Sequence, residues 1–295
     1  MVNDASQTQR IGPGSTGSAT LRAQILLDRF HFSPGEIDGS YGRNMQIAIK
    51  GFQASYKLEP TGFVDEQTWQ LLNADSSPAV VSYTITDEDT KGPFEKIPSD
   101  MMEQAQLKTL GYQSAAEELG EKFHVNPALL AKLNPSKTLE TAGEELQVPN
   151  VQRDPSTAKA DEVIVSKTRQ IVQARSGGKL LAQYPATIGS EHDPLPIGDW
   201  KITVVQKHPV FNYNPDLFWD ADPGHSKAKI PPGPNNPVGV VWIGLSKEHY
   251  GIHGTPEPGT IGHTQSHGCI RLTNWDATEL ASMVKPGLKV VLQEP

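Results

Sequence analysis

The sequence predicts a multidomain fold: a small three-helix N-terminal domain, an α+β module, and a larger, mostly-β C-terminal domain of sandwich or barrel-like form. The chain has 295 residues, which exceeds the roughly 100–200 residues of one compact domain. Apolar residues recur at helical spacing near the N-terminus, whereas short β-branched runs between Gly and Pro follow residue 161. Two polar segments, 73–80 and 151–160, are predicted linkers, so we expect domains at 17–75, 81–150 and 161–295.

Composition and charge exclude several classes of protein. The net charge is −8 with no basic stripe, which argues against nucleic acid as a partner. No apolar run approaches the roughly 20 residues that cross a bilayer, so no transmembrane segment is expected. The single cysteine, Cys269, excludes an internal disulfide framework. The first residues lack the pattern of a signal peptide, which leaves a cytosolic protein or a processed mature form.

The N-terminal region predicts three helices after a polar, aperiodic stretch, residues 1–16, that we expect to be mobile. The first helix carries Leu21, Ile25 and Leu26 on one side, the second spans 45–56, and the third contains Trp69. The region resembles a small peptidoglycan-binding domain through the motifs Ile37-Asp38-Gly39-x-Tyr41-Gly42, Ala48-x-x-x-Phe52-Gln53 and Thr61-Gly62-x-Val64-x-x-x-Thr68-Trp69-x-x-Leu72.

The middle region predicts a strand at 81–86, helices at 115–123 and 127–133, and a closing strand at 143–149. Its residues Leu129-Leu130-x-x-Leu133-Asn134-Pro135 and Leu146-x-Val148-Pro149 resemble a LysM module, a βααβ fold that binds N-acetylglucosamine polymers. About 25 residues stand where a LysM module has a very short first loop. A structural spacer is therefore an equal alternative to a sugar-binding module.

The C-terminal region predicts a β-rich core with one helix near 275–283, which Asn274 is expected to cap. Residues 208–237 interrupt this pattern with an aromatic-rich loop of low periodicity, and a loop of this length favours a lid or a substrate wall. The predicted strands are 163–165, 170–174, 184–188, 200–205, 238–243 and 289–292.

Cys269 lies in Ser266-His267-Gly268-Cys269-Ile270-Arg271, and His253-Gly254 stands sixteen positions before it. A thiol becomes a nucleophile as the thiolate, and a nearby imidazole is the usual base. We therefore expect His253 to take the thiol proton, with backbone N–H groups around Gly268 stabilising an oxyanion. Arg271 suits a bidentate contact to a substrate carboxylate. This pattern indicates acyl transfer.

The same residues resemble the L,D-transpeptidase catalytic domain of YkuD type over 161–293, including Thr187-Ile188-Gly189 and Pro194-x-Pro196-x-Gly198-x-Trp200. The resemblance implies a cysteine acyltransferase without metal or cofactor. It assigns two sets of site residues. The catalytic set is Cys269, His253, Gly254, His267 and Gly268, and the substrate-binding set is Arg271, Tyr250 and Ser266.

By this resemblance the Cys269 thiolate attacks a peptidoglycan stem tetrapeptide, D-alanine leaves, and a thioester remains. An amine then forms a 3→3 cross-link. The acceptor stays open among another stem peptide, an envelope lipoprotein lysine, a D-amino acid and water. The resemblance also implies peptidoglycan stem peptides and glycan strands as partners, a periplasmic or cell-envelope location after removal of a signal peptide, and susceptibility to carbapenems.

Three alternatives remain at this point. His253, His263, His267 and Cys269 are possible zinc ligands, although their spacing matches no common zinc finger. With water as acceptor, the same thiolate makes an L,D-carboxypeptidase. A catalytically silent wall-binding protein is the third alternative.

Overall fold

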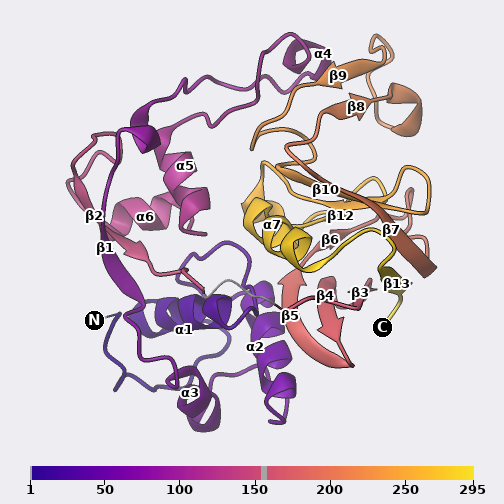
Figure 1. The fold of residues 1–295 in the computed structure, drawn as a ribbon. Helices are drawn as coiled ribbons and strands as arrows, with labels where there is room; N and C mark the ends of the chain where they lie inside the picture. The colour runs from indigo at the N-terminus through magenta and orange to yellow at the C-terminus, as the bar shows by residue number, and fades with distance from the viewer. Residues whose placement is uncertain (1, 154–157) are drawn as a thin grey trace.

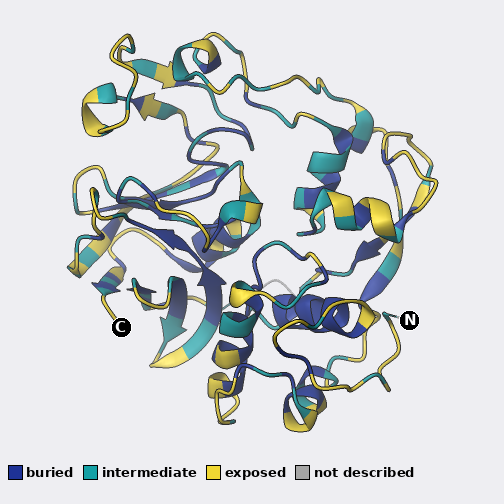
Figure 2. Ribbon diagram, turned by 180° about the vertical axis from the view of Figure 1, so that it is seen from behind, coloured by how far each residue is buried: buried dark blue, intermediate teal, exposed yellow. Residues whose placement is uncertain are grey.

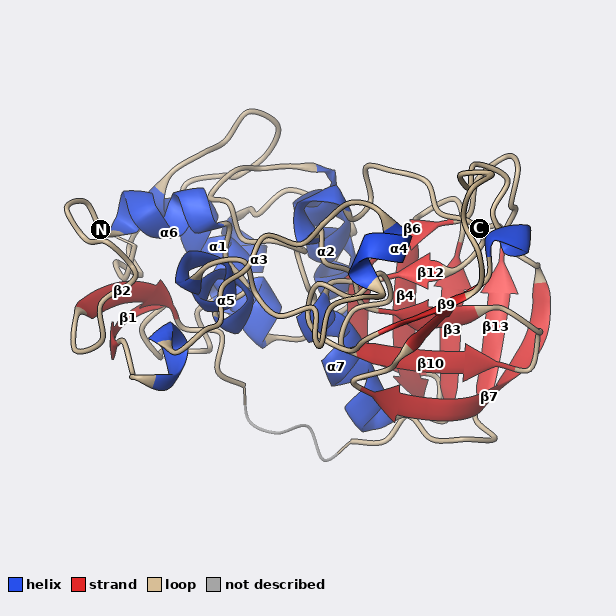
Figure 3. Ribbon diagram, turned by 90° about the horizontal axis from the view of Figure 1, so that it is seen from above, coloured by secondary structure: helices blue, strands red, loops and turns tan. Residues whose placement is uncertain are grey.

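A computed structural model describes residues 2–153 and 158–295. Figure 1 shows the three-helix region at the bottom, the middle module on one side and the large sheet on the other. The helical regions and the sheet lie at opposite ends when the molecule is seen from above (Figure 3). No helix among these residues is long and apolar enough to cross a membrane.

The N-terminal domain contains α1 (Ser18–Arg29), α2 (Arg43–Ser55) and α3 (Glu66–Leu72), as its apolar spacing predicts. Phe52 and Trp69 lie at the centre of its core and are almost fully buried. In the preceding segment, residues 3–6 and 8–10 are exposed, and the chain becomes buried only at Ile11 and Gly12. Ile11 is 1% exposed and pairs with Val64 through two backbone hydrogen bonds.

Helix α1 is buried on nearly every side, as Figure 2 shows in dark blue. Its residues Ala23 and Leu26 belong to the core of the N-terminal domain, whereas Leu21 and Ile25 pack into the core of the middle module. Its polar side chains find distant partners: Arg22 donates to Asn73 Oδ1 at 2.6 Å. One helix therefore serves two cores, which joins the two domains into one packed unit.

The middle region is a βααβ module formed by β1 (Val80–Thr84), α5 (Ala115–Lys122), α6 (Pro127–Leu133) and β2 (Glu145–Pro149), and β1 pairs antiparallel with β2. Ser114 Oγ caps α5 by accepting from Glu117 N at 3.1 Å. Asn126 caps α6 in the same way.

Between β1 and α5, the chain runs across to the large domain and carries α4 (Met101–Gln104), which contacts β9 (Ala228–Ile230) (Figure 1). Leu110 of this segment is fully buried with Tyr213 and Ile230 of the large domain. Its backbone donates to Pro232 O and accepts from Asn235 N, both at 3.0 Å. The insertion therefore links the module to residues 208–237.

The large domain is built on one nine-stranded sheet of order β5-β4-β3-β13-β7-β10-β11-β12-β6. Its end strands, β5 and β6, are consecutive in the chain, so the curled sheet is a nearly closed, barrel-like structure. The strands are β3 (Glu162–Ser166), β4 (Ile171–Ser176), β5 (Lys179–Pro185), β6 (Thr187–Ile188), β7 (Gly198–Lys207), β10 (Val241–Leu245), β11 (Gly251–His253), β12 (Ile270–Arg271) and β13 (Lys289–Gln293).

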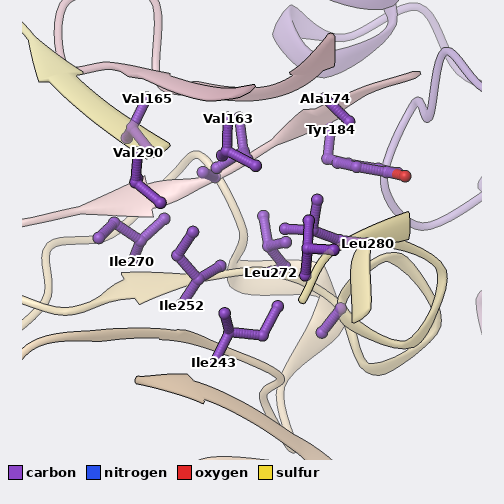
Figure 4. Close-up of a cluster of buried hydrophobic side chains, with 14 of the residues drawn as sticks. Val163, Val165, Ala174, Tyr184, Ile243, Ile252, Ile270, Leu272, Leu280 and Val290 are labelled. Carbon is purple, nitrogen blue, oxygen red and sulfur yellow. The ribbon is translucent and has the colours of Figure 1, made fainter. Parts of the chain in front are cut away.

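The core of this domain lies between the curled sheet and α7 (Asn274–Met283), and Figure 4 shows its labelled side chains pointing toward one another. Ile243, Ile252 and Ile270 come from three adjacent strands and are fully buried. Successive side chains of a strand alternate between faces. The neighbouring residues on these strands therefore face away from the core, on the side where the site lies.

Three details differ from the sequence expectations. Residues 208–237 contain a small hairpin, β8 (Phe211–Tyr213) with β9 (Ala228–Ile230), and a short helix, η2 (Pro215–Leu217). Thr273 caps α7 by accepting from Asp276 N, so Asn274 is its first helical residue. Residues 154–157 of the expected linker lie outside the described residues, and Val151 just before them is buried.

Candidate active site

Strands β11 and β12 place two of the predicted site residues, His253 and Arg271, side by side. These strands pair in parallel, with Ile252 opposite Ile270 and His253 opposite Arg271. The two isoleucines enter the core, so alternation puts His253 and Arg271 on the opposite face. Cys269 precedes Arg271 by two positions, and its Sγ donates to His249 O at 3.6 Å.

The His253 ring is held by the carbonyl of Gly254 and by the indole of Trp242. Its Nδ1 lies 2.7 Å from Gly254 O, so Nδ1–H donates and Nε2 is left as an acceptor. Trp242 stacks on the ring with centroids 5.5 Å apart, and the imidazole is only 4% exposed. Gly251 makes room for this indole, because a Cβ there would lie 2.6 Å from it.

The His253 imidazole and the Cys269 thiol are both neutral near pH 7. Burial, helped by the nearby Arg271 charge, lowers the pKa of His253 to about 3. Burial raises the pKa of the Cys269 thiol to about 11, and the Gly251 backbone and the Arg271 charge only partly offset it. The resting pair is therefore a thiol and an imidazole, not a thiolate and an imidazolium.

The turn before Cys269 presents backbone donors. Gly268 has φ of +90°, and a Cβ there would approach the Tyr250 ring to 2.9 Å. Ser266 Oγ donates to Cys269 O at 2.6 Å, and Ser266 N donates to Gly189 O at 3.1 Å, which fixes the turn at both ends. Within the described part of the chain, the amides of His267, Gly268 and Cys269 donate to no other group.

His267 faces the 208–237 region. Its Nε2 lies 2.8 Å from Asp220 Oδ1, and its ring packs against Phe218 and Trp219. Trp219 also stacks on His192 with centroids 4.6 Å apart. The segment between β8 and β9 therefore contacts both His267 and His192.

Several residues of the site carried no sequence signal. Trp242 and Asp220 contact the two histidines but belong to no motif. Asp193 contributes a charge that raises the pKa of both Cys269 and Tyr250. Asn274 packs against Gly254, although its position near a helix start suggested only a cap. Except for the contact between Trp242 and His253, which comes from the pairing of adjacent strands, these contacts form between distant parts of the chain, so local spacing could not predict them.

The described residues contain no group of three or more His, Cys, Asp or Glu side chains arranged to hold a metal ion. His253 uses one ring nitrogen on Gly254 O, His267 uses one on Asp220, and His263 is exposed on the loop. The four side chains considered as zinc ligands therefore do not converge.

Comparison with known proteins identifies two regions. Residues 160–292 match the family described as "L,D-transpeptidase catalytic domain", and residues 16–72 match a "Putative peptidoglycan binding domain". The chain is 31% identical over 171 residues to "Putative L,D-transpeptidase YkuD" of Bacillus subtilis (strain 168), covering 58% of this chain and 88% of the relative. It is 27% identical over 226 residues to "Probable L,D-transpeptidase YbiS" of Escherichia coli (strain K12), covering 74% and 73%. Among solved structures, an L,D-transpeptidase from Xylanimonas cellulosilytica DSM 15894 is 17% identical, covers 96% of this chain and 97% of that chain, and has a TM-score of 0.41.

The fold and the relatives define a cell-wall enzyme with a peptidoglycan-binding domain at its N-terminal end. The chain belongs to the L,D-transpeptidase family of YkuD type, and it acts as an L,D-transpeptidase on peptidoglycan. The roles of the individual site residues remain predictions.

Proposed function

We propose that Cys269 is the nucleophile and His253 the general base of a transpeptidation that passes through a thioester. The observation that carries this is the bond from His253 Nδ1–H to Gly254 O. It leaves Nε2 unprotonated on a ring that lies opposite Arg271, two positions from Cys269 in the chain. General base catalysis of this kind contributes about 10²–10⁴-fold.

In the first step, Sγ of Cys269 bonds to the carbonyl carbon at the L-centre of diaminopimelate in a stem tetrapeptide, while His253 Nε2 takes the thiol proton. The amide bond to D-alanine then breaks, and the leaving amine receives that proton from His253. In the second step an acceptor amine attacks the thioester, a new amide forms, and the sulfur regains its proton through His253. The cross-link is then of the 3→3 type.

The surrounding groups fit the charges of this reaction. The amides of His267, Gly268 and Cys269 are free to donate to the oxyanion of each tetrahedral intermediate. Arg271 lies close enough to Cys269 for each charge to alter the other's pKa, which suits it to hold a substrate carboxylate. Tyr250 and Ser266 complete the substrate side through the turn at Gly268.

Incubation with purified muropeptides and mass spectrometry tests this proposal. Cross-linked dimers and free D-alanine from the native chain, with neither from Cys269→Ala, are the expected result. Tripeptides without dimers would identify an L,D-carboxypeptidase instead. D-Alanine release by Cys269→Ala would refute the nucleophile. Added D-amino acids or lysine peptides identify other acceptors, including a lipoprotein lysine.

We further propose that the βααβ module is LysM-like in its strand and helix order but serves mainly as a bridge. The support is its insertion, which is buried against the catalytic domain through Leu110. Cosedimentation with peptidoglycan should then depend on the N-terminal domain, and N-acetylglucosamine oligomers should not compete. We propose the periplasm as the location within the envelope, which fractionation of cells tests.

A further inference from the structure

Helix α5 of the βααβ module contacts the catalytic domain close to the site. Glu121 Oε1 accepts a hydrogen bond from Asn274 Nδ2 at 2.8 Å, across 153 positions of sequence. One turn earlier, Glu117 Oε1 accepts from Asn235 Nδ2 at 2.7 Å. Two carboxyl groups of one helix therefore hold two amide side chains of the neighbouring domain.

The Asn274 side chain is buried and tightly packed. It is 2% exposed and lies between Gly239 and Gly254: a Cβ added at either glycine would lie 2.1 or 2.2 Å from Asn274 Oδ1. That oxygen accepts from Val240 N at 3.1 Å, and Nδ2 also donates to Pro234 O at 3.1 Å. These two bonds fix the orientation of the amide and direct an N–H of Nδ2 at Glu121.

Gly254 lies between Asn274 and His253 and contacts both residues. Its carbonyl accepts from His253 Nδ1 at 2.7 Å, and its N–H donates to Val241 O at 3.2 Å. Asn274 packs directly on Gly254, so a shift of the asparagine moves the carbonyl that sets the tautomer and angle of the His253 ring.

We propose that Glu121 is a positioning residue for the transpeptidase reaction: by holding Asn274 against Gly254, it fixes the imidazole of His253 from outside the catalytic domain. The inference rests on the proposed role of His253 as base. It makes the catalytic domain incomplete without the βααβ module, because among the described residues Glu121 is the one group from outside that domain that bonds the Asn274 side chain.

The protonation state of Glu121 fits this role. Burial raises its pKa to about 8, and the Asn274 bond only partly offsets the rise. The group is therefore mostly protonated near pH 7 and acts as a neutral acceptor. Glutamine, which has the same shape and one carbonyl oxygen, should replace it.

The experiment compares Glu121→Met, which keeps the volume and loses the acceptor, with Glu121→Gln, both in the full chain. Glu118→Met is the matched control, since Glu118 lies on the same helix and senses Asp89 and Lys122 of its own module. We expect Glu121→Met to lower kcat on a stem tetrapeptide by about 10–100-fold with KM changed less than about 2-fold, because small misplacements of a reacting group cost up to about 10²-fold. Glu121→Gln and the control should stay within about 3-fold.

Nitrogen-15 spectra of labelled histidine give a readout that a purely structural role does not move. His253 should show the Nδ1–H tautomer in the native chain and in Glu121→Gln, and a mixture of tautomers in Glu121→Met. If Glu121→Met keeps a single tautomer and native kcat, the proposal is wrong. Equal losses in both Glu121 variants also refute it. Should Glu121→Met not fold, Glu121→Ala takes its place with the same expected results.

Activity in Cys269→Ala would overturn the proposed function alone, because the tautomer of His253 reports on Glu121 independently of turnover.

Discussion

Replacing His253 by Ala should change the pH dependence of Cys269 reactivity as well as its rate. In the native chain the pKa of the imidazole is about 3 and that of the thiol is about 11. Neither group changes its charge between pH 7 and pH 9. Alkylation assisted by a neutral base should therefore vary by less than about 2-fold across this range.

Without the imidazole, alkylation depends on the free thiolate. Its fraction at a pKa of about 11 is roughly 10⁻⁴ at pH 7 and 10⁻² at pH 9, so the rate should rise about 100-fold across these two units. At pH 7 the variant should be slower than the native chain by about 10²–10⁴-fold. Iodoacetamide labelling followed by intact-protein mass spectrometry at a series of pH values measures both effects.

His267→Ala is the control, because Nε2 of that ring is bonded to Asp220 of the 208–237 region. This variant should keep a flat profile and lose activity only through altered turn geometry. A steep profile in His267→Ala with a flat one in His253→Ala would exchange the roles of the two histidines. A steep profile in the native chain would show that neither acts as base.

Three further changes test other parts of the molecule. A carbapenem should add its whole mass to the native chain, since its carbonyl can occupy the oxyanion position at Gly268, and an adduct that persists in Cys269→Ala would contradict this. Trp219→Ala should lower kcat/KM about 10-fold or more through the lost contacts to His192 and His267 while changing stability by less than about 0.5 kcal/mol, because Trp219 is 62% exposed; equal effects on both would make the tip part of the core. Arg153→Met should destabilise the fold by about 3–5 kcal/mol in urea titrations, because it leaves Asp28 buried with only His124 as partner, and Arg153→Met with Asp28→Asn should recover part of the loss.

Much of the catalytic domain could be predicted from the sequence, because its short β-branched runs are bounded by Gly and Pro. His253, Cys269 and Arg271 were predicted from the chemistry of a lone cysteine with a histidine nearby and from the motifs His253-Gly254 and Ser266-His267-Gly268-Cys269-Ile270-Arg271. The caps of α5 and α6 are also local signals. These features share one property: the residues that determine them lie within about twenty positions of one another in the chain.

Contacts between distant segments could not be predicted. The apolar spacing of α1 indicated one buried face, but the helix is buried on both sides, and its polar residues bond to partners far along the chain. Arg29 NH groups reach the carbonyls of Ser77 and Pro78, and Asp28 meets His124 at 3.1 Å. Nothing near α1 in the sequence shows that these partners exist. The Glu121–Asn274 bond is a further case.

The Asp28 cluster bears on how the wall-binding part and the catalytic part cooperate. Burial alone would raise the pKa of Asp28, but the charges of Arg153 and His124 outweigh it and hold that pKa well below its usual range. The carboxylate therefore stabilises the fold at neutral pH, and this contribution is lost as the pH falls below about 4, where the unfolded chain takes up the proton first.

Arg153 also pairs with Glu279 of α7, which lies in the catalytic domain, and His31 bonds to the same carboxylate. This buried network includes residues of all three domains. It opposes independent motion of the domains, because separating them would leave buried charges without partners. A flexible tether raises the substrate concentration in every direction. This arrangement instead holds the peptidoglycan-binding domain in one orientation relative to the catalytic domain.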